Sequence, residues 1–303
     1  MSESSYFPRI SIVITSYNQG RYLADAIESV ISQDYSNLEL VIIDGGSTDK
    51  SKDIIQQYEP RLSYWASEAD NGQSEAINKG FQKCTGDIIT FLSSDDLYLP
   101  NACTYVAEQW KKHPGCGAIV GGFKFIDENG EFSENTISPR LPYPSPIDLR
   151  SIPPKAWRLH QVSTFYTRNA LDQVGRNVRE DLLYVMDREL LFRVAKEFEI
   201  VLDERPYAAF RRHSESKSMV NLIPFGEEFG NLYLEALSED KADNKNKERF
   251  AKYFRAKGYF SFAKYQPNLI RSSAWFFRAA QIYPRFLTTK NYWKSMIKKL
   301  WNK

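Results

Sequence analysis

The first part of the chain alternates short apolar runs with segments of helical periodicity. Strands are predicted at 10–15, 38–43, 62–66, 87–92 and 118–125. Residues 22–32 place Leu23, Ala26, Ile27, Val30 and Ile31 on one helical face, and similar patterns separate the later strands. Because strands that alternate with helices form parallel sheets covered on both faces, we expect an α/β fold with a mostly parallel sheet.

The second half of the chain has shorter elements. A proline-rich stretch at 139–154 predicts a long loop, because proline suits neither a helix interior nor a central strand. Further on, the pattern favours a strand near 162–166, a helix at 187–196 and a strand at 199–202. Beyond Asn221 it is helical, so we expect a main domain over 1–218 and a helical C-terminal region over 219–303.

The composition is that of an ordinary globular protein, with 42% hydrophobic and 26% charged residues. No stretch approaches the roughly 20 apolar residues of a membrane-spanning helix, and the first nine residues lack the apolar core of a signal peptide. Cys84, Cys103 and Cys116 show no metal-binding spacing, which favours reduced thiols. We therefore expect a cytoplasmic protein.

The net charge of +2 hides an asymmetry between the front of the chain and its tail. Residues 251–303 contain 12 Lys/Arg and no Asp/Glu, which leaves 28 basic and 38 acidic residues in 1–250, so nucleic acid is not an expected partner. Near the end, one helical face carries Tyr292, Trp293, Met296, Ile297, Leu300 and Trp301 beside a lysine-bearing flank. This pattern predicts a helix lying on an anionic membrane surface; packing on the rest of the protein is the alternative.

Polar residues collect where three predicted strands end. They are Thr15 to Asn18, Asp44 with Gly45-Gly46, and Ser93 to Asp96. Because ligands of open α/β sheets bind at the carboxyl ends of the strands, these three clusters should meet. Asp95 and Asp96 supply hard oxygen ligands for Mg²⁺ or Mn²⁺, although an aspartate here also suits a helix N-cap. The chain has neither a GxxxxGK[ST] nor a GxGxxG phosphate loop.

Together these segments resemble the family 2 glycosyltransferases, inverting enzymes with the GT-A (Rossmann-like) fold that occur in bacterial polysaccharide biosynthesis. The resemblance runs from Arg9 to about Ser218, and it is specific because its motifs occur in the same order as in the family. These motifs are Ile10–Asn18, Tyr22–Tyr35, Val41–Asp49, Trp65–Gln73, Asn78–Gly80, Thr85–Asp87 and Phe91–Asp96. It implies a nucleotide-diphosphate sugar donor, a divalent cation, and a glycan or lipid-linked acceptor.

The resemblance also implies which residues bind the donor: Thr15, Tyr17, Asn18, Asp44, Asp70, Gln73, Asn78, Lys79, Ser94, Asp95 and Arg211. Thr15, Tyr17 and Asp44 should line the base and ribose pocket, with Asp44 accepting from a base N–H. An aspartate before two glycines is equally typical of a turn. Lys79 could instead be an exposed helix charge.

For the metal, Asp96 matches the last position of the DxD motif of the family. Ser94 stands at the first position, which leaves open whether Asp95 contacts the ribose or binds the metal through water. Residues 210–218 resemble the closing R-x-H-x-x-S-x-S segment. There Arg211 is expected to stabilise the leaving diphosphate and His213 to complete the metal shell, with a purely structural histidine as the alternative.

On the acceptor side, Asp187 is the candidate general base, since inversion needs a base on the face opposite the leaving group. Met186 stands where related enzymes have a glutamate. Glu189 and the Glu180-Asp181 pair are rivals, and an aspartate favoured by the helix dipole is the non-catalytic alternative. His160-Gln161 resembles another acceptor-side element of the family.

We therefore expect a metal-dependent inverting glycosyltransferase of surface polysaccharide synthesis, acting on the cytoplasmic side and peripheral on the inner face of the cell membrane. A nucleotidyltransferase is one alternative, although Ser16 to Arg21 is a poor version of its glycine-rich loop. A non-catalytic module that binds sugar nucleotides is another, left open by Ser94 and Met186. The base, the sugar, the acceptor and the linkage are not encoded in any motif of this sequence.

Overall fold

The computed structural model describes residues 7–139, 159–217, 222–236, 244–265 and 269–288. Contacts divide the chain into two compact units, the first ending at His213 and the second beginning at Ser214. The predicted boundary after residue 218 falls outside the described residues and stays a prediction. The same holds for nearly all of the proline-rich loop and for the predicted membrane-binding helix near the C-terminus.

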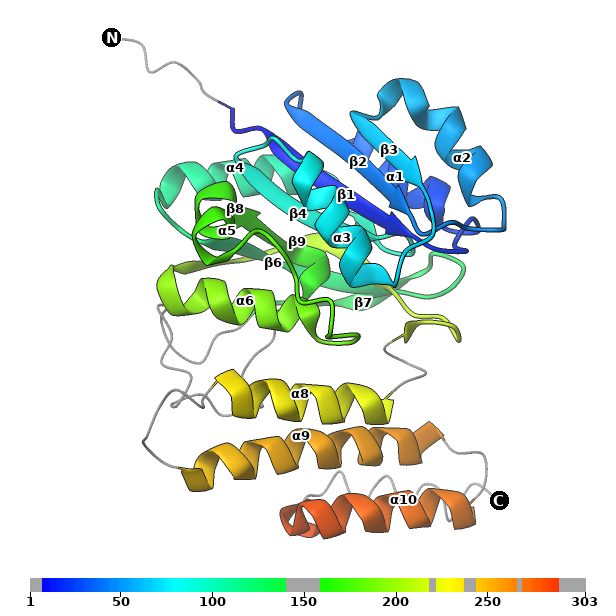
Figure 1. Cartoon of the computed structure of the whole chain (residues 1–303), viewed down its shortest axis with the longest axis vertical. Coiled ribbons are helices and arrows are strands. Elements are labelled where there is room, and N and C mark those ends of the chain that lie inside the picture. Colours follow the sequence, from blue (N-terminus) through cyan, green and yellow to red (C-terminus); the bar gives the residue numbers. More distant parts are fainter. Residues whose placement is uncertain (1–6, 140–158, 218–221, 237–243, 266–268, 289–303) are drawn as a thin grey trace. The chain divides into compact units, whose positions relative to one another are not determined.

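The first unit is built on a nine-stranded sheet (Figure 1). One part consists of four parallel strands in the order β3 (Tyr64–Ser67), β2 (Leu38–Asp44), β1 (Ile10–Ser16) and β4 (Ile88–Ser93). The register pairs Ser16 with Asp44 and Thr15 with Ser93. The carboxyl ends of β1, β2 and β4 are therefore level, and the three polar clusters lie along one edge.

The other part of the sheet mixes strand directions. It contains β8 (Thr164–Thr167), β6 (Ala118–Ile126), β9 (Ile200–Arg211), β5 (Leu97–Tyr98) and β7 (Phe132–Ile137). β8 pairs antiparallel with β4 and with β6, β9 runs parallel to β6, and β5 pairs antiparallel with β9. β9 is longer than predicted, and its last residues return to the segment that follows β4.

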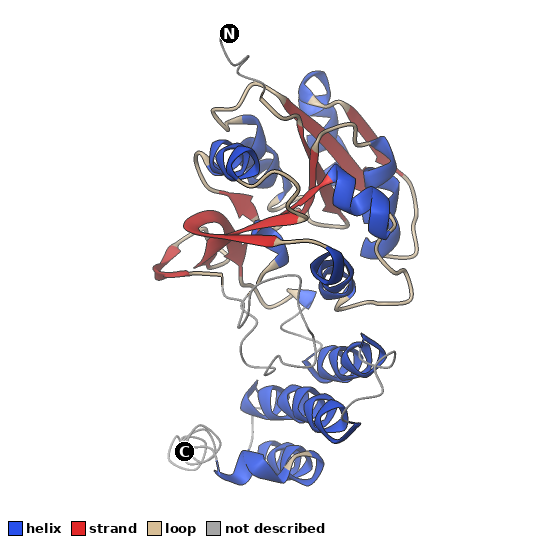
Figure 2. Cartoon of the chain, turned by 90° about the vertical axis from the view of Figure 1, so that its left-hand side faces the viewer, coloured by secondary structure: helices blue, strands red, loops and turns tan. Residues whose placement is uncertain are grey.

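Helices cover both faces of this sheet (Figure 2). They are α1 (Leu23–Ile31), α2 (Ser51–Tyr58), α3 (Gln73–Lys83), α4 (Ala102–Lys112), α5 (Arg168–Val174) and α6 (Met186–Glu197). α1 and α4 share the main core with alternate residues of β1 such as Ile12 and Ile14. α3 lies against Val13 on the opposite face, where a Cβ on Gly80 would stand 2.3 Å from a Val13 methyl group. The predicted α/β fold is confirmed.

The second unit consists of three helices side by side, α8 (Leu222–Ala236), α9 (Asn244–Tyr265) and α10 (Leu269–Ile282) (Figure 1). α8 and α9 cross closely at Gly226 and Gly258, and a Cβ on Gly258 would be 2.6 Å from the Leu222 carbonyl oxygen. Phe260 and Phe276 join α9 to α10 in a small apolar core. The helical C-terminal region is confirmed. None of the helices that the structure describes is both long and apolar enough to cross a bilayer.

Candidate active site

The loops after β1 and β2 are hydrogen-bonded to each other. Asn18 has a left-handed backbone, with φ of 52°; its N–H donates to Ser47 Oγ at 2.7 Å, and its Oδ1 accepts from the Thr48 N–H at 2.8 Å. Beside this junction the Tyr17 side chain is 63% exposed. An exposed phenol ring on a fixed loop is available to stack on a planar base.

Asp44 ends β2 with a fully buried carboxylate. Its Oδ2 accepts from the Ser47 N–H at 2.9 Å and from Ser67 Oγ at 2.8 Å, and its Oδ1 accepts from Ser47 Oγ at 2.5 Å. Asp44 therefore organises the turn, which was the alternative role, and its contact with a base stays a prediction. Thr15 and Ser94 are also buried and are joined by a bond from the Ser94 N–H to the Thr15 carbonyl at 3.1 Å.

Asp70 approaches the β2 turn from the loop after β3. A Cβ on Gly45 would lie 2.9 Å from Asp70 Oδ2, so glycine leaves the room that this carboxylate occupies. Burial raises the pKa of Asp70, an effect that the Gly72 N–H, donating at 2.9 Å, opposes. The arrangement puts a second carboxylate beside Asp44 at the edge where the donor is expected.

The α3 residues predicted to border the donor point to different places. Gln73 Nε2 donates to Ser93 Oγ at 3.1 Å, at the carboxyl end of β4. The Lys79 ammonium lies 2.9 Å from the carboxylates of both Glu68 and Glu75, and these bonds raise its pKa. Gln73 therefore lies at the predicted edge, whereas Lys79 is held in two ion pairs on the helix surface.

Asn78 holds a distant segment of the chain. Its Oδ1 accepts from the Val178 N–H at 2.8 Å, and its Nδ2 donates to the Val178 carbonyl at 3.0 Å and to Glu180 Oε1 at 2.8 Å. One turn earlier, Ser74 Oγ donates to the Leu182 carbonyl at 2.9 Å. The predicted donor contact of Asn78 is not supported, because its amide is used to position the segment that leads into α6. Sequence reasoning does not single out Ser74, which belongs to no motif.

The two aspartates that follow β4 have opposite environments. Asp95 Oδ2 lies 2.9 Å from His213 Nε2, while Asp96 is 2% exposed and its Oδ1 accepts the Arg211 N–H at 2.8 Å. Burial, followed by the charge of Asp95, raises the pKa of Asp96 well above its ordinary value. The predicted metal ligands Asp96 and His213, together with Asp95, whose role the sequence leaves open, are thus brought to one turn from positions more than 110 residues apart.

Arg211 supports this turn from inside the protein. Its side chain is 2% exposed, its Nε donates to the Asp95 carbonyl at 2.8 Å and its Nη1 to the Asp127 carbonyl at 3.3 Å. Its guanidinium also lies 4.7 Å from the centre of the Tyr22 ring, a contact that the sequence does not predict. The expected contact of Arg211 with diphosphate is not supported, because the guanidinium is buried and its donors serve the protein itself. Arg212, the next residue, is exposed.

This turn has the donor types that a divalent cation requires. Carboxylate oxygens and a neutral imidazole bind Mn²⁺ or Mg²⁺, and a cation would replace the proton shared by Asp95 and His213. Within the described residues, no three His, Cys, Asp or Glu side chains are already gathered as a metal site. Such an incomplete ligand set suits a cation whose remaining positions are filled by phosphate oxygens.

Asp187 lies in the first turn of α6 and its side chain is 20% exposed. Its Oδ2 is 3.8 Å from Arg188 Nε. The rival Glu189 is bound by Arg193 through two bonds of 2.7 and 2.8 Å. Asp181, another rival, pairs with Arg179 at 2.6 Å. Glu189 and Asp181 are thus engaged in short structural contacts, and the role of Asp187 as the base stays a prediction.

The segment before β8 brings two further side chains to the end of β4. The His160 ring centre lies 4.6 Å from those of Phe123 and Phe210, and Gln161 Nε2 donates to the Phe91 carbonyl of β4. Burial, followed by the charges of Arg188 and Arg212, lowers the pKa of His160 to about 3. His160 is therefore a neutral imidazole at physiological pH.

Solved structures of other proteins share this fold. The chain superposes with a TM-score of 0.60 on residues 1–349 of TarS from S. aureus, at 16% identity, over 91% of this chain and 80% of that one. With the mannosyltransferase PcManGT from Pyrobaculum calidifontis, in complex with GDP-Man and Mn²⁺, the TM-score is 0.61 at 19% identity, over 99% and 89%. Identities this low establish the fold alone, which is that of the GT-A glycosyltransferases.

The sequence comparison is more specific. Residues 11–175 match the profile of Glycosyl transferase family 2, and the chain belongs to this family of glycosyltransferases. An uncharacterized glycosyltransferase of Rickettsia felis is 29% identical over 217 residues, which cover 70% of this chain and 36% of that protein. Another, from Nostoc, is 37% identical over 129 residues, 40% of each chain. The chain thus spans about two fifths of the length of these relatives.

Proposed function

We propose that the protein transfers a sugar from a nucleotide-diphosphate donor to a hydroxyl of a glycan or lipid-linked acceptor, with inversion, in the synthesis of a surface polysaccharide. The observation that carries the proposal is the turn after β4, where Asp95 lies 2.9 Å from His213 and Asp96 accepts the Arg211 N–H, beside the level carboxyl edge of β1, β2 and β4. Solved proteins of this fold in complex with UDP-GlcNAc and with GDP-Man support a nucleotide-sugar donor.

In this proposal the donor lies along the edge formed by the loops after β1 and β2. Tyr17 stacks on the base, and Thr15 and Asp44 shape the pocket for base and ribose. Asp95, Asp96 and His213 would hold Mn²⁺ or Mg²⁺, which would supply positive charge to the leaving diphosphate. Arg211 holds the backbone of this turn through its bond to the Asp95 carbonyl.

Asp187 acts on the other substrate. Its carboxylate takes the proton of the acceptor hydroxyl, whose oxygen attacks carbon 1 of the sugar as the bond from carbon 1 to the diphosphate oxygen breaks. Arg188 Nε lies 3.8 Å from this carboxylate. The acceptor enters from the side of α6, opposite the diphosphate. We place the enzyme on the cytoplasmic side of the membrane, where nucleotide sugars are available.

Calorimetric titration of UDP-, GDP- and dTDP-sugars, with Mn²⁺ and with EDTA, tests the donor site. Asp96→Asn keeps an oxygen for the Arg211 N–H and should remove most of the cation-dependent affinity. Asp53→Asn, an exposed aspartate on α2, is the matched control. Equal affinities of the wild-type protein with Mn²⁺ and with EDTA would overturn metal dependence. Donor binding without either hydrolysis or transfer would instead support the non-catalytic alternative.

A further inference from the structure

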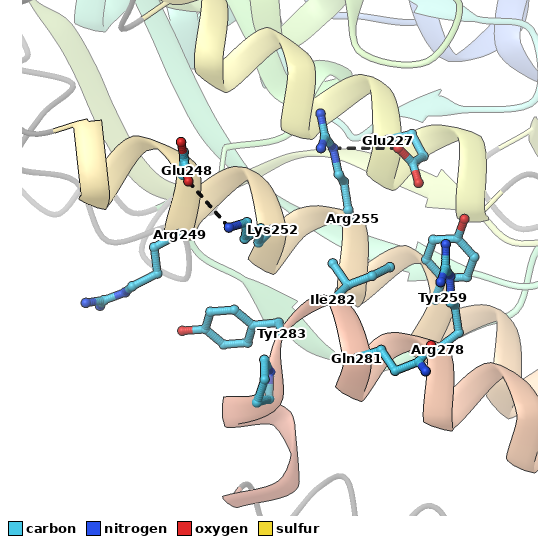
Figure 3. A pocket seen from close by; sticks show the side chains of 11 residues that line it. Glu227, Glu248, Arg249, Lys252, Arg255, Tyr259, Arg278, Gln281, Ile282 and Tyr283 are labelled. Carbon is cyan, nitrogen blue, oxygen red and sulfur yellow. Dashed lines mark hydrogen bonds and ion pairs between the residues drawn. The ribbon is translucent and has the colours of Figure 1, made fainter.

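The helical unit contains a pocket of about 710 Å³ that is lined entirely by residues of α8, α9, α10 and the turn after α10 (Figure 3). Its volume is within the range of small-molecule sites. The charged lining residues are Arg249, Lys252, Arg255 and Arg278, against Glu227 and Glu248. Four cations and two carboxylates leave an excess of two positive charges.

The pocket is formed by defined faces of two helices. Arg249, Lys252, Arg255 and Tyr259 follow one another at intervals of three or four residues, so they share one face of α9. A different face of α9, which includes Phe260, packs against α10. The basic face is therefore left to line the pocket because the apolar face is already buried.

The cations of the pocket differ in how they are held. Arg255 Nε lies 3.6 Å from Glu227 Oε2, and its Nη2 donates to Asn231. Lys252 Nζ lies 3.4 Å from Glu248, its neighbour one turn away. Arg278 makes no ion pair or hydrogen bond within the parts of the chain that the structure describes. Arg255 is thus fixed in place, and the charge of Arg278 is available for an anionic ligand.

Two exposed apolar side chains are close in the chain to residues that line the pocket. Phe277, which precedes Arg278, is 64% exposed, and Leu287 in the turn after α10 is 42% exposed. Guanidinium groups suit phosphate because they donate two parallel hydrogen bonds, and exposed aromatic and aliphatic groups beside cations are typical of surfaces that enter the headgroup region of a bilayer. A free anion would make no use of the apolar groups.

We propose that this pocket binds the phosphate group of a membrane lipid, with Phe277 and Leu287 entering the adjoining apolar layer. The ligand chemistry is a phosphate ester on a lipid, as in an anionic phospholipid or a lipid-linked acceptor. The site goes beyond the proposed sugar transfer, since no residue of the sheet edge takes part in it. It is also distinct from the predicted helix near the C-terminus, which lies outside the described residues.

Flotation of the full chain with vesicles tests this site. The vesicles contain phosphatidylcholine alone or with a minority of phosphatidylglycerol. The pocket variant is Lys252→Gln with Arg278→Gln, and the control is Lys257→Gln with Arg285→Gln, which removes one lysine and one arginine of the same unit outside the pocket. We expect the pocket variant to bind phosphatidylglycerol vesicles about tenfold more weakly than the control, with donor binding unchanged in both.

Calorimetry with inorganic phosphate and with glycerol phosphate distinguishes a lipid phosphate from a soluble phosphate as the ligand of the pocket. Weak binding of both compounds that is weaker still in the pocket variant than in the control, together with the tenfold vesicle effect, supports a lipid site. Equal loss of vesicle binding in both variants would overturn the proposal in favour of general charge attraction. Loss of inorganic phosphate binding in the pocket variant, with vesicle binding retained, would overturn it in favour of a soluble ligand. Because the C-terminal residues are the same in both variants, their contribution cancels in the comparison.

Discussion

The donor edge and the acceptor side of the site are stabilised by different kinds of contact. The donor edge, the loops after β1 and β2, is held by bonds such as that between Asn18 and Thr48, which are 30 positions apart. The acceptor side, residues 160–187, is held from the sheet and from α3 by bonds that span 70 to 108 positions. The contact between these two loops can therefore form once β1 and β2 have paired, whereas the acceptor side depends on α3 being seated on the sheet. Substrate binding and proton transfer should respond differently to mutation.

The largest expected effect is on proton transfer. Asp187→Asn keeps the shape of the side chain but removes its basicity, and should lower turnover by roughly 10²–10⁴-fold at unchanged donor affinity. Single-turnover transfer and donor titration measure the two quantities. Glu189→Gln is the matched control and should retain turnover in whatever fraction stays folded. Wild-type turnover in Asp187→Asn with loss in Glu189→Gln would move the base to Glu189.

A smaller effect is expected where α3 positions the acceptor side. Asn78→Ala leaves the Val178 N–H and carbonyl without their partner, at a cost of about 1–3 kcal/mol per unsatisfied group, and loosens the segment before α6. Turnover at saturating donor should fall about tenfold, as expected for imprecise placement of a base, while donor affinity should change less than twofold.

The control for Asn78→Ala is Gln82→Ala, an exposed residue of the same helix. Steady-state kinetics at several donor concentrations separate turnover from affinity. If Asn78→Ala binds the donor poorly yet has normal turnover at saturating donor, Asn78 contacts the donor. That result would agree with the family resemblance and contradict the role inferred from the hydrogen bonds described above.

The smallest expected effect is on stability and concerns His160. Its pKa is lowered to about 3 in the folded protein, against an ordinary value of about 6.5. As the pH falls below 6.5, the unfolded chain binds a proton that the folded chain excludes, so the free energy of unfolding decreases by up to about 1.4 kcal/mol per pH unit. His160→Gln should flatten this decrease between pH 6.5 and 4 in urea unfolding.

The control for His160→Gln is His113→Gln, at the exposed end of α4. An identical slope in His160→Gln and in the wild-type protein would show that His160 is protonated in the fold. That result would also remove the argument that the acceptor side presents a neutral imidazole at this position.

The sequence predicts well those features that depend on local pattern. β1, β2, β4 and β6 carry apolar runs and were located within a residue or two, but β5 has two residues and β7 is largely exposed, so neither shows a periodic signal. The donor edge follows from short motifs near the strand ends. The orientations of Asn78 and Arg211 do not follow from these motifs, because their hydrogen-bond partners lie about a hundred residues away. A motif identifies a residue but does not determine the direction of its side chain.

The contacts of Arg211 have a consequence for biosynthesis. Asp96 and the backbone of Asp95 gain their partners from a residue 115 and 116 positions later, at the end of the last strand of the sheet. While the chain is being made, the acidic turn is therefore exposed and unsupported until β9 has left the ribosome and inserted beside β6. Fragments that stop before β9 contain the motifs from Ile10 to Asp96 and both aspartates, yet lack the contacts that hold the turn. The turn with the two aspartates is thus translated more than 100 residues before the strand that supports it.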